Sequence, residues 1–169
     1  MIRRALLAFA LLSAPLTLSG CGFTPVYAQK GLPGELANID VITTDSRTGY
    51  FLRQNLVSGF NTLEGQKRYR LSVKLEEKRY DVGVGINDIA VRTEISTKVQ
   101  YSLIEAATRK VLITGTFVDS TTYDANAQSP YAGVAAQKDG QQRAATAIGE
   151  RIRSELVLFF HDKKAAPAS

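Results

Sequence analysis

The stretch Arg68-Tyr-Arg-Leu-Ser-Val-Lys-Leu-Glu-Glu-Lys-Arg-Tyr80 decides the fold, because apolar and polar side chains alternate along it. Successive side chains of a β-strand point to opposite faces of a sheet, so this alternation predicts a half-buried strand. Its buried face would carry Tyr69, Leu71, Val73 and Leu75. Its exposed face would carry Arg68, Arg70, Ser72, Lys74, Glu76 and Lys78.

Two more strands follow in the same pattern. A hairpin connection is expected over 81–88, where glycines and turn-forming residues gather. In the next strand the core residues would be Ile89, Val91, Ile95, Val99, Tyr101 and Leu103, with Arg92, Glu94, Lys98 and Gln100 facing away. After a turn at 106–110, a third strand over 111–123 would bury Ile113 and Phe117 and expose Thr114, Thr116, Ser120 and Thr122. The three strands predict an antiparallel meander.

The flanking segments supply a further strand and two helices. A short strand is expected over 36–43, and Ser46 can cap a helix that begins near Tyr50. Helical spacing there aligns Leu52, Leu56 and Phe60, and a longer helix over 130–160 aligns Ile148, Ile152, Leu156 and Phe159. The order strand, helix, three strands, helix predicts an α+β fold. We expect a two-layer sandwich in which a four-stranded, mostly antiparallel sheet has both helices on one face and leaves the other open.

The first twenty residues have the three parts of a secretory signal peptide. Arg3 and Arg4 form a cationic start, residues 5–16 are nearly all apolar, and small residues precede Cys21. The apolar run is shorter than the ~20 residues that a membrane-spanning helix needs. We therefore expect residues 1–20 to be removed and the mature chain to contain no transmembrane helix.

The tetrad Leu18-Ser19-Gly20-Cys21 resembles the lipobox that bacterial lipoprotein-processing enzymes read. The Cys21 thiol would receive a diacylglyceryl group and become the first mature residue, and two or three acyl chains give lasting attachment to a membrane. Glycine rather than aspartate follows the cysteine, which favours the outer membrane over retention in the inner one. We expect a lipid anchor facing the periplasm. The alternative is an incidental thiol after an ordinary signal peptide.

The mature chain has the length of one domain. Residues 21–34, rich in glycine and proline, are expected to form a lipidated tether, 35–162 a single domain and 163–169 a disordered tail. Without Arg3 and Arg4 the chain has 19 cationic and 16 acidic residues, a net charge of +3. That balance suits anionic lipid head groups and is too weak to indicate a nucleic acid.

Three groups of residues resemble the lipopolysaccharide-assembly lipoprotein family, LptE, in its alphaproteobacterial form. They are Cys21-Gly22-Phe23-Thr24-Pro25-Val26-Tyr27, Leu52-Arg53 with Leu56, and Tyr131-Ala132 with Asp139 and Arg143. The resemblance implies the sandwich described above. It also implies a partner, the lipopolysaccharide-export barrel LptD of the outer membrane, in which the lipoprotein sits as a plug, and it implies binding of lipopolysaccharide.

The exposed face of the predicted sheet holds a row of cations that can meet glycolipid phosphates. The row consists of Arg68, Arg70, Lys74 and Lys78 on one strand and Arg92 and Lys98 on the next. Arginine grips phosphate by two parallel hydrogen bonds, so the arginines are better candidates than the lysines. The alternative for any single residue is an ordinary solvated strand face.

The predicted hairpin tip exposes Val82, Val84 and Ile86 where turns are normally polar. Such residues can insert into an apolar groove, a lipid or a barrel wall, and the tip is therefore a candidate partner-contact loop. Continuation of the strands through these residues explains them equally well.

No arrangement of residues in the sequence indicates catalysis, a metal or a cofactor. Cys21 is the one cysteine and would be consumed by acylation, and His161 is the one histidine. We therefore expect a binding protein rather than an enzyme, and a periplasmic hydrolase is the weakest alternative. The main rival is an auxiliary lipoprotein of an ABC-type lipid transport system, a different class of similar size and anchor.

Overall fold

The computed structural model describes residues 32–62, 64–84, 90–124 and 129–165. The elements in chain order are α2 (Leu32–Ala37), β1 (Ile39–Thr43), α3 (Arg47–Phe60), β2 (Tyr69–Val84), β3 (Ala90–Glu105), β4 (Val111–Asp124) and α4 (Pro130–Ala165). The four strands form one sheet in the order β1-β2-β3-β4, in which β1 is parallel to β2 and the other pairs are antiparallel. The predicted α+β architecture and element order are confirmed.

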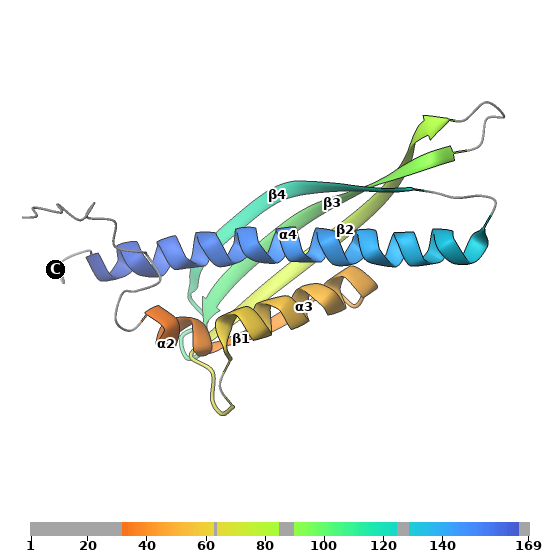
Figure 1. Ribbon diagram of the computed structural model, residues 1–169. Helices are drawn as coiled ribbons and strands as arrows, with labels where there is room; N and C mark the ends of the chain where they lie inside the picture. Colours follow the sequence, from red (N-terminus) through yellow and green to blue (C-terminus); the bar gives the residue numbers. More distant parts are fainter. Residues whose placement is uncertain (1–31, 63, 85–89, 125–128, 166–169) are drawn as a thin grey trace, which may run out of the picture.

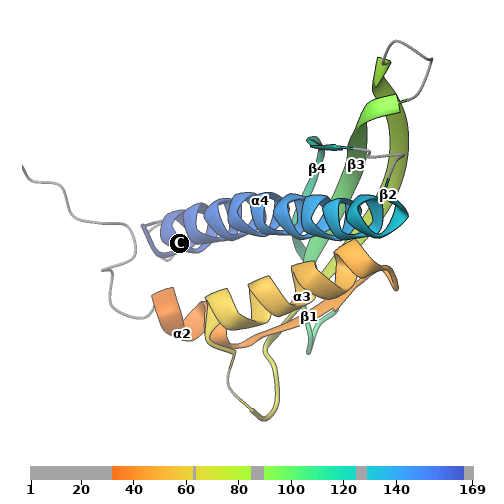
Figure 2. The ribbon, with the colours of Figure 1, turned by 45° about the vertical axis from the view of Figure 1, so that its right-hand side comes forward.

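The sheet and the helices form two layers. Both long helices lie on the same side of the sheet, and the opposite face of the sheet is open (Figures 1 and 2). α3 runs beside β1 and α4 crosses the longer strands, so each helix buries the apolar stripe that its sequence spacing predicts. Among the described residues, no helix combines the length and apolarity needed to cross a bilayer.

The core lies between these two layers and follows the alternation of the strands. Alternate residues of β2 and β3 point toward the helices and are buried, including Tyr69, Leu71, Val73, Val99, Tyr101 and Leu103. From the helices, Leu52, Leu56, Phe60, Ile148, Ile152 and Leu156 meet them. On α4 the fully buried aromatic is Phe160, 2% exposed, and the predicted Phe159 packs at the edge of the core.

The start of α3 shows how local sequence sets an element boundary. The Ser46 side chain accepts a hydrogen bond from the N–H of Gly49 at 3.0 Å, the capping interaction expected from the sequence. The helix begins at Arg47 rather than near Tyr50 because the cap fixes the first turn directly after Ser46. It ends at Phe60, where Asn61 adopts the left-handed conformation with φ 50° and donates its N–H to the last turn.

Two boundaries predicted from the sequence are wrong, and at a third the structure favours one of two interpretations that the sequence left open. Residues 32–37 form the helix α2 instead of tether and strand, so the first strand begins at Ile39. The predicted tail begins too early, because α4 continues through Lys163 to Ala165. β2 continues through Val82 to Val84 rather than turning at 81, because its backbone still pairs with β3 there. Signal peptide, Cys21, Ile86 and Ile89 lie outside the described residues.

Candidate functional site

Five of the six predicted cations lie exposed on the open face of the sheet. They are Arg70, Lys74, Lys78, Arg92 and Lys98. Arg68, just before β2, lies apart from them: its guanidinium is 3.6 Å from the Glu35 carboxylate of α2 and stacks over the Tyr69 ring. The strand pattern therefore placed five of these side chains correctly.

Carboxylates on the same face interrupt the row. Arg70 pairs with Asp40 of β1 at 3.3 Å, and Glu76 lies directly opposite Lys98 in the β2–β3 register. No ion pair is seen for Lys74 or Lys78 within the part of the chain that the structure describes. The open face is therefore nearly balanced in charge, and Lys98 likewise has no ion pair among the described residues.

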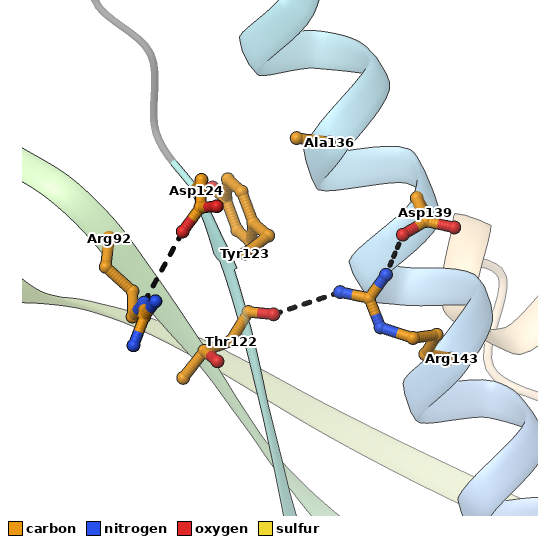
Figure 3. Close-up of a pocket in the computed structure, with 7 residues that line it drawn as sticks. All are labelled: Arg92, Thr122, Tyr123, Asp124, Ala136, Asp139 and Arg143. Atoms are coloured by element: carbon orange, nitrogen blue, oxygen red, sulfur yellow. Dashed lines mark hydrogen bonds and ion pairs between the residues drawn. The ribbon is translucent and has the colours of Figure 1, made fainter.

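A polar cleft lies where the end of β4 passes the first half of α4. Its volume is about 310 Å³, and it is lined by Arg92, Thr122, Tyr123, Asp124, Ala136, Asp139 and Arg143 (Figure 3). On the sheet side, Arg92 of β3 pairs with Asp124 of β4 at 3.4 Å, since the two residues are directly opposite in register. On the helix side, Arg143 pairs with Asp139 one turn earlier and donates a hydrogen bond to the Thr122 carbonyl at 3.0 Å.

The cleft presents two guanidinium groups from opposite walls. Both are about half exposed, 58% for Arg92 and 51% for Arg143, and exposed ion pairs contribute only ~0–1 kcal/mol. A phosphate that enters the cleft can therefore replace a carboxylate partner at small cost and gain paired hydrogen bonds. Of the cleft cations, strand alternation indicated Arg92 and the family resemblance indicated Arg143. The sequence analysis did not identify Asp124 as a residue of this site, because only the β3–β4 register places it beside Arg92.

The residues of the resemblance in α3 have structural contacts, whereas Tyr131 faces solvent. Leu52 and Leu56 are buried, and Arg53 donates a hydrogen bond to the Val41 carbonyl of the edge strand β1 at 3.2 Å. Tyr131 is 90% exposed at the start of α4. At the predicted tip, Val82 on β2 is 50% exposed and is therefore accessible to a partner. Its role as a partner contact stays a prediction.

A second polar group lies under α4, on the helix side of the sheet. Glu77, Thr97 and Asp119 lie directly opposite one another on β2, β3 and β4. Glu77 accepts hydrogen bonds from the Thr48 hydroxyl at 2.7 Å and the Gln141 amide at 3.1 Å, which joins β2 to both long helices. The sequence analysis did not place these three residues, because the inward faces that it predicted consist of apolar side chains and tyrosines.

Asp119 is a carboxylate of this row with one oxygen that is unpaired within the described residues. Burial raises the pKa of its carboxyl, and the positive charge of Arg151 opposes that rise. Its Oδ2 is buried without a hydrogen-bond partner among the residues described. Folding therefore disfavours the charged form of Asp119 relative to the unfolded chain.

We expect Asp119→Asn to raise the melting temperature at pH 7 and to leave it nearly unchanged at pH 3. A pKa that folding raises means that stability is fully present below the unfolded value and is lost as the pH rises through the folded value. Asparagine stays neutral and avoids this loss. Thermal unfolding followed by circular dichroism from pH 3 to pH 7 measures the effect, with the exposed Asp45→Asn as the control. A lower melting temperature for Asp119→Asn at pH 7 would mean that attraction to Arg151 outweighs burial.

The described residues contain no group of three or more histidine, cysteine, aspartate or glutamate side chains placed to hold a metal ion. His161 lies near the end of α4, where its ring nitrogen Nδ1 is 3.1 Å from the Asp162 carboxylate.

Comparison with known proteins finds relatives along most of the chain. No family model matches the chain. An uncharacterised protein of Rickettsia prowazekii (strain Madrid E) is 26% identical over 152 residues, which is 85% of this chain and 90% of that protein.

Solved structures of lipoproteins share the fold. Rare lipoprotein B from Shewanella oneidensis is 13% identical with a TM-score of 0.51, over 73% of this chain and 98% of that one. A minor lipoprotein from Acinetobacter baumannii is 11% identical with a TM-score of 0.53, over 71% of this chain and 90% of that one. At these identities the likeness shows the fold alone.

One solved structure is similar in sequence as well. It is that of a predicted lipoprotein from Caulobacter crescentus CB15, with 32% identity and a TM-score of 0.69. The match covers 82% of this chain and 99% of that one. The chain therefore belongs to the same family as this Caulobacter crescentus lipoprotein.

Proposed function

We propose that this protein is a lipid-anchored component of the outer-membrane lipopolysaccharide transport machine. It is held on the periplasmic side through acyl chains on Cys21, acts as partner and plug of an LptD-type β-barrel, and binds lipopolysaccharide. Its role is binding and assembly rather than catalysis.

The observation that carries this proposal is the fold shared with rare lipoprotein B, an LptE-type protein. The family relation to a predicted lipoprotein supports the anchor, and so does the lipobox Leu18-Ser19-Gly20-Cys21. The resemblance of the segment from Cys21 to Tyr27 to the LptE family supports the same assignment independently of the fold.

The open sheet face and the adjoining cleft are the proposed surfaces for lipopolysaccharide. Lys74 and Lys78 offer ammonium groups without carboxylate partners among the described residues, and Arg92 and Arg143 offer guanidiniums across the cleft. Lipopolysaccharide carries several phosphates on one rigid glycolipid head, so cations spread over a face and a cleft can engage it together. Arg68 lies apart from the open face, and Arg70 pairs with Asp40 outside the cleft, so both are weaker candidates than strand alternation predicts.

Affinity purification of the full chain from detergent-solubilised membranes tests this function. We expect a stoichiometric outer-membrane β-barrel, bound lipopolysaccharide and labelled fatty acid on the mature N-terminus. The Cys21→Ser chain is the control and is expected to carry no fatty acid. Recovery of an ABC-type ATPase complex instead of a barrel would contradict the proposal. It would indicate an auxiliary lipoprotein of an ABC-type lipid transport system. Recovery of the wild-type chain free of the membrane and without fatty acid would contradict the proposed lipid anchor.

A further inference from the structure

A second cleft lies at the end of the molecule where α2 begins. It is lined by Lys110, Val111 and Leu112 from the start of β4 and by Phe159, Asp162 and Lys163 from α4, and its volume is about 400 Å³. Figure 1 shows α2, the C-terminal part of α4 and the turn between β3 and β4 at this same end. The cleft of Arg143 lies some twenty residues earlier on α4, about 30 Å away along the helix at 1.5 Å per residue.

The contacts of Tyr69 tie α2 to this end. The Tyr69 hydroxyl donates a hydrogen bond to Glu35 of α2 at 2.8 Å, and its ring centroid is 5.2 Å from that of Phe160 on α4. The Lys163 ammonium lies 5.8 Å from the same ring. α2 therefore lies at the same end of the molecule as this cleft, on the side of Lys163.

The segment outside the structure brings the acylated cysteine within reach of this end. Ten residues, 22–31, separate Cys21 from α2. A fully extended chain spans at most ~3.3–3.6 Å per residue, so the anchor lies no more than about 40 Å from α2. A tether of this reach allows the end of the domain at which it enters to touch the bilayer.

The two ends of the molecule differ in charge. At the tether end, the described residues 35, 64–68, 105–110 and 161–164 contain six cations and four carboxylates: Lys67, Arg68, Arg109, Lys110, Lys163 and Lys164 against Glu35, Glu64, Glu105 and Asp162. At the opposite end, the described residues in 77–82, 92–94, 119–124 and 138–143 contain five cations and six carboxylates. The excess of positive charge therefore lies at the tether end, where it complements an anionic membrane surface.

Exposed aliphatic side chains accompany these cations. Val111 at the cleft and Leu158 beside Phe159 are each 55% exposed. Lysines that flank exposed aliphatic residues suit a bilayer interface, where the ammonium groups reach phosphates and the apolar side chains enter the acyl boundary.

We propose that this end is a membrane-contact surface, defined by Lys110, Val111, Leu112, Phe159 and Lys163, that binds anionic phospholipid of the leaflet carrying the anchor. Lys110 and Lys163 contact head-group phosphates, and Val111 and Leu112 lie against the acyl boundary. The inference rests on the proposed function in one respect, because acylation of Cys21 is what brings this end to the bilayer. It adds an orientation, in which the C-terminal end of α4 lies at the membrane surface and the Arg143 cleft lies farther along the helix.

The test uses the unacylated chain 22–169, which holds the whole core cluster of residues 36–160. Its binding to vesicles of phosphatidylethanolamine with about 30 mol% phosphatidylglycerol is measured by co-sedimentation and compared with binding to phosphatidylcholine vesicles. We expect preference for the anionic vesicles. A surface lysine contributes about fivefold in membrane affinity, so Lys110→Gln with Lys163→Gln should weaken binding about 25-fold.

The matched control is Lys74→Gln with Lys78→Gln, which removes the same charge from the open sheet face and should change binding less than twofold. Circular dichroism confirms that both variants fold. Equal weakening by the two pairs, or equal binding to both vesicle types, would overturn the proposal. So would full competition by millimolar inorganic phosphate, which would assign the lysines to a free anion. The protein in this assay carries no acyl chain, and no barrel is present. The outcome is therefore independent of the outcome of the affinity purification.

Discussion

Gly49→Ala is expected to destabilise the protein by about 2–3 kcal/mol, although alanine is the better helix former by ~1 kcal/mol. An ideal Cβ at Gly49 would lie 2.0 Å from the backbone oxygen of Thr44 and 3.1 Å from Ser46 Oγ. The Thr44 backbone cannot easily withdraw, because its N–H bonds to the Val73 carbonyl at 3.1 Å and its side chain accepts from Leu75 N–H at 2.9 Å. The methyl group would therefore force apart the corner that joins β1, β2 and α3.

Gly59→Ala in the same helix is the matched control for this effect. Gly59 is exposed, and a Cβ there would meet only the flexible side chain of Arg153, at 3.3 Å. Its expected effect is a gain of up to ~1 kcal/mol from helix propensity. Urea unfolding of both variants measures the difference. Similar free energies of unfolding for the two variants would show that the backbone near Thr44 can move away from the new methyl group without loss of stability.

Gly115→Ala is expected to cost about 2–3 kcal/mol through a clash within the core. Gly115 lies directly opposite Tyr101, and its ideal Cβ would be 2.3 Å from the ring carbon Cε1. Tyr101 is 4% exposed, and its hydroxyl donates a hydrogen bond to Glu155 of α4. Moving the ring would break this link between sheet and helix, and burial together with Glu155 already raises the Tyr101 pKa well above its usual range.

A double-mutant cycle with Tyr101→Leu identifies the clash as the cause. Leucine keeps an apolar side chain at the position but removes the ring atoms that Cβ would meet. Gly115→Ala should cost far less in that background, with a coupling of at least ~1 kcal/mol. Strict additivity would contradict the clash. Gly34→Ala, whose Cβ meets nothing within 4 Å, is the control for substitution of a glycine in general.

Much of the sheet could be predicted from the sequence because strand alternation is a local property. The inward positions Tyr69, Leu71, Val99 and Leu103 are all buried as the pattern requires. Ser46 also acts as the predicted cap, since a side-chain bond to the N–H three residues later needs no distant partner. Prediction failed at Leu32–Ala37, where α2 is only six residues long and is fixed by packing on α3 and α4.

The candidate sites depended on contacts between distant residues. Alternation placed Arg70 and Arg92 on the exposed face, yet it could not show that Asp40 and Asp124 stand beside them. Those carboxylates change a predicted cationic row into a nearly neutral face, with the lysines as its remaining cations. The cleft of Lys110 and Lys163 was likewise outside local reasoning, because its walls come from β4 and the end of α4.

The sequence by itself determined the class of elements, their order, the inward faces of the strands and the anchor expected at Cys21. Each of these depends on neighbours within a few residues, through side-chain periodicity, capping and the spacing of a targeting motif. Only the tertiary structure decided which charges are neutralised, where clefts open and which end of the domain carries the positive excess. Those properties depend on strand register and helix packing, and register is set by residues tens of positions apart that no local pattern brings together.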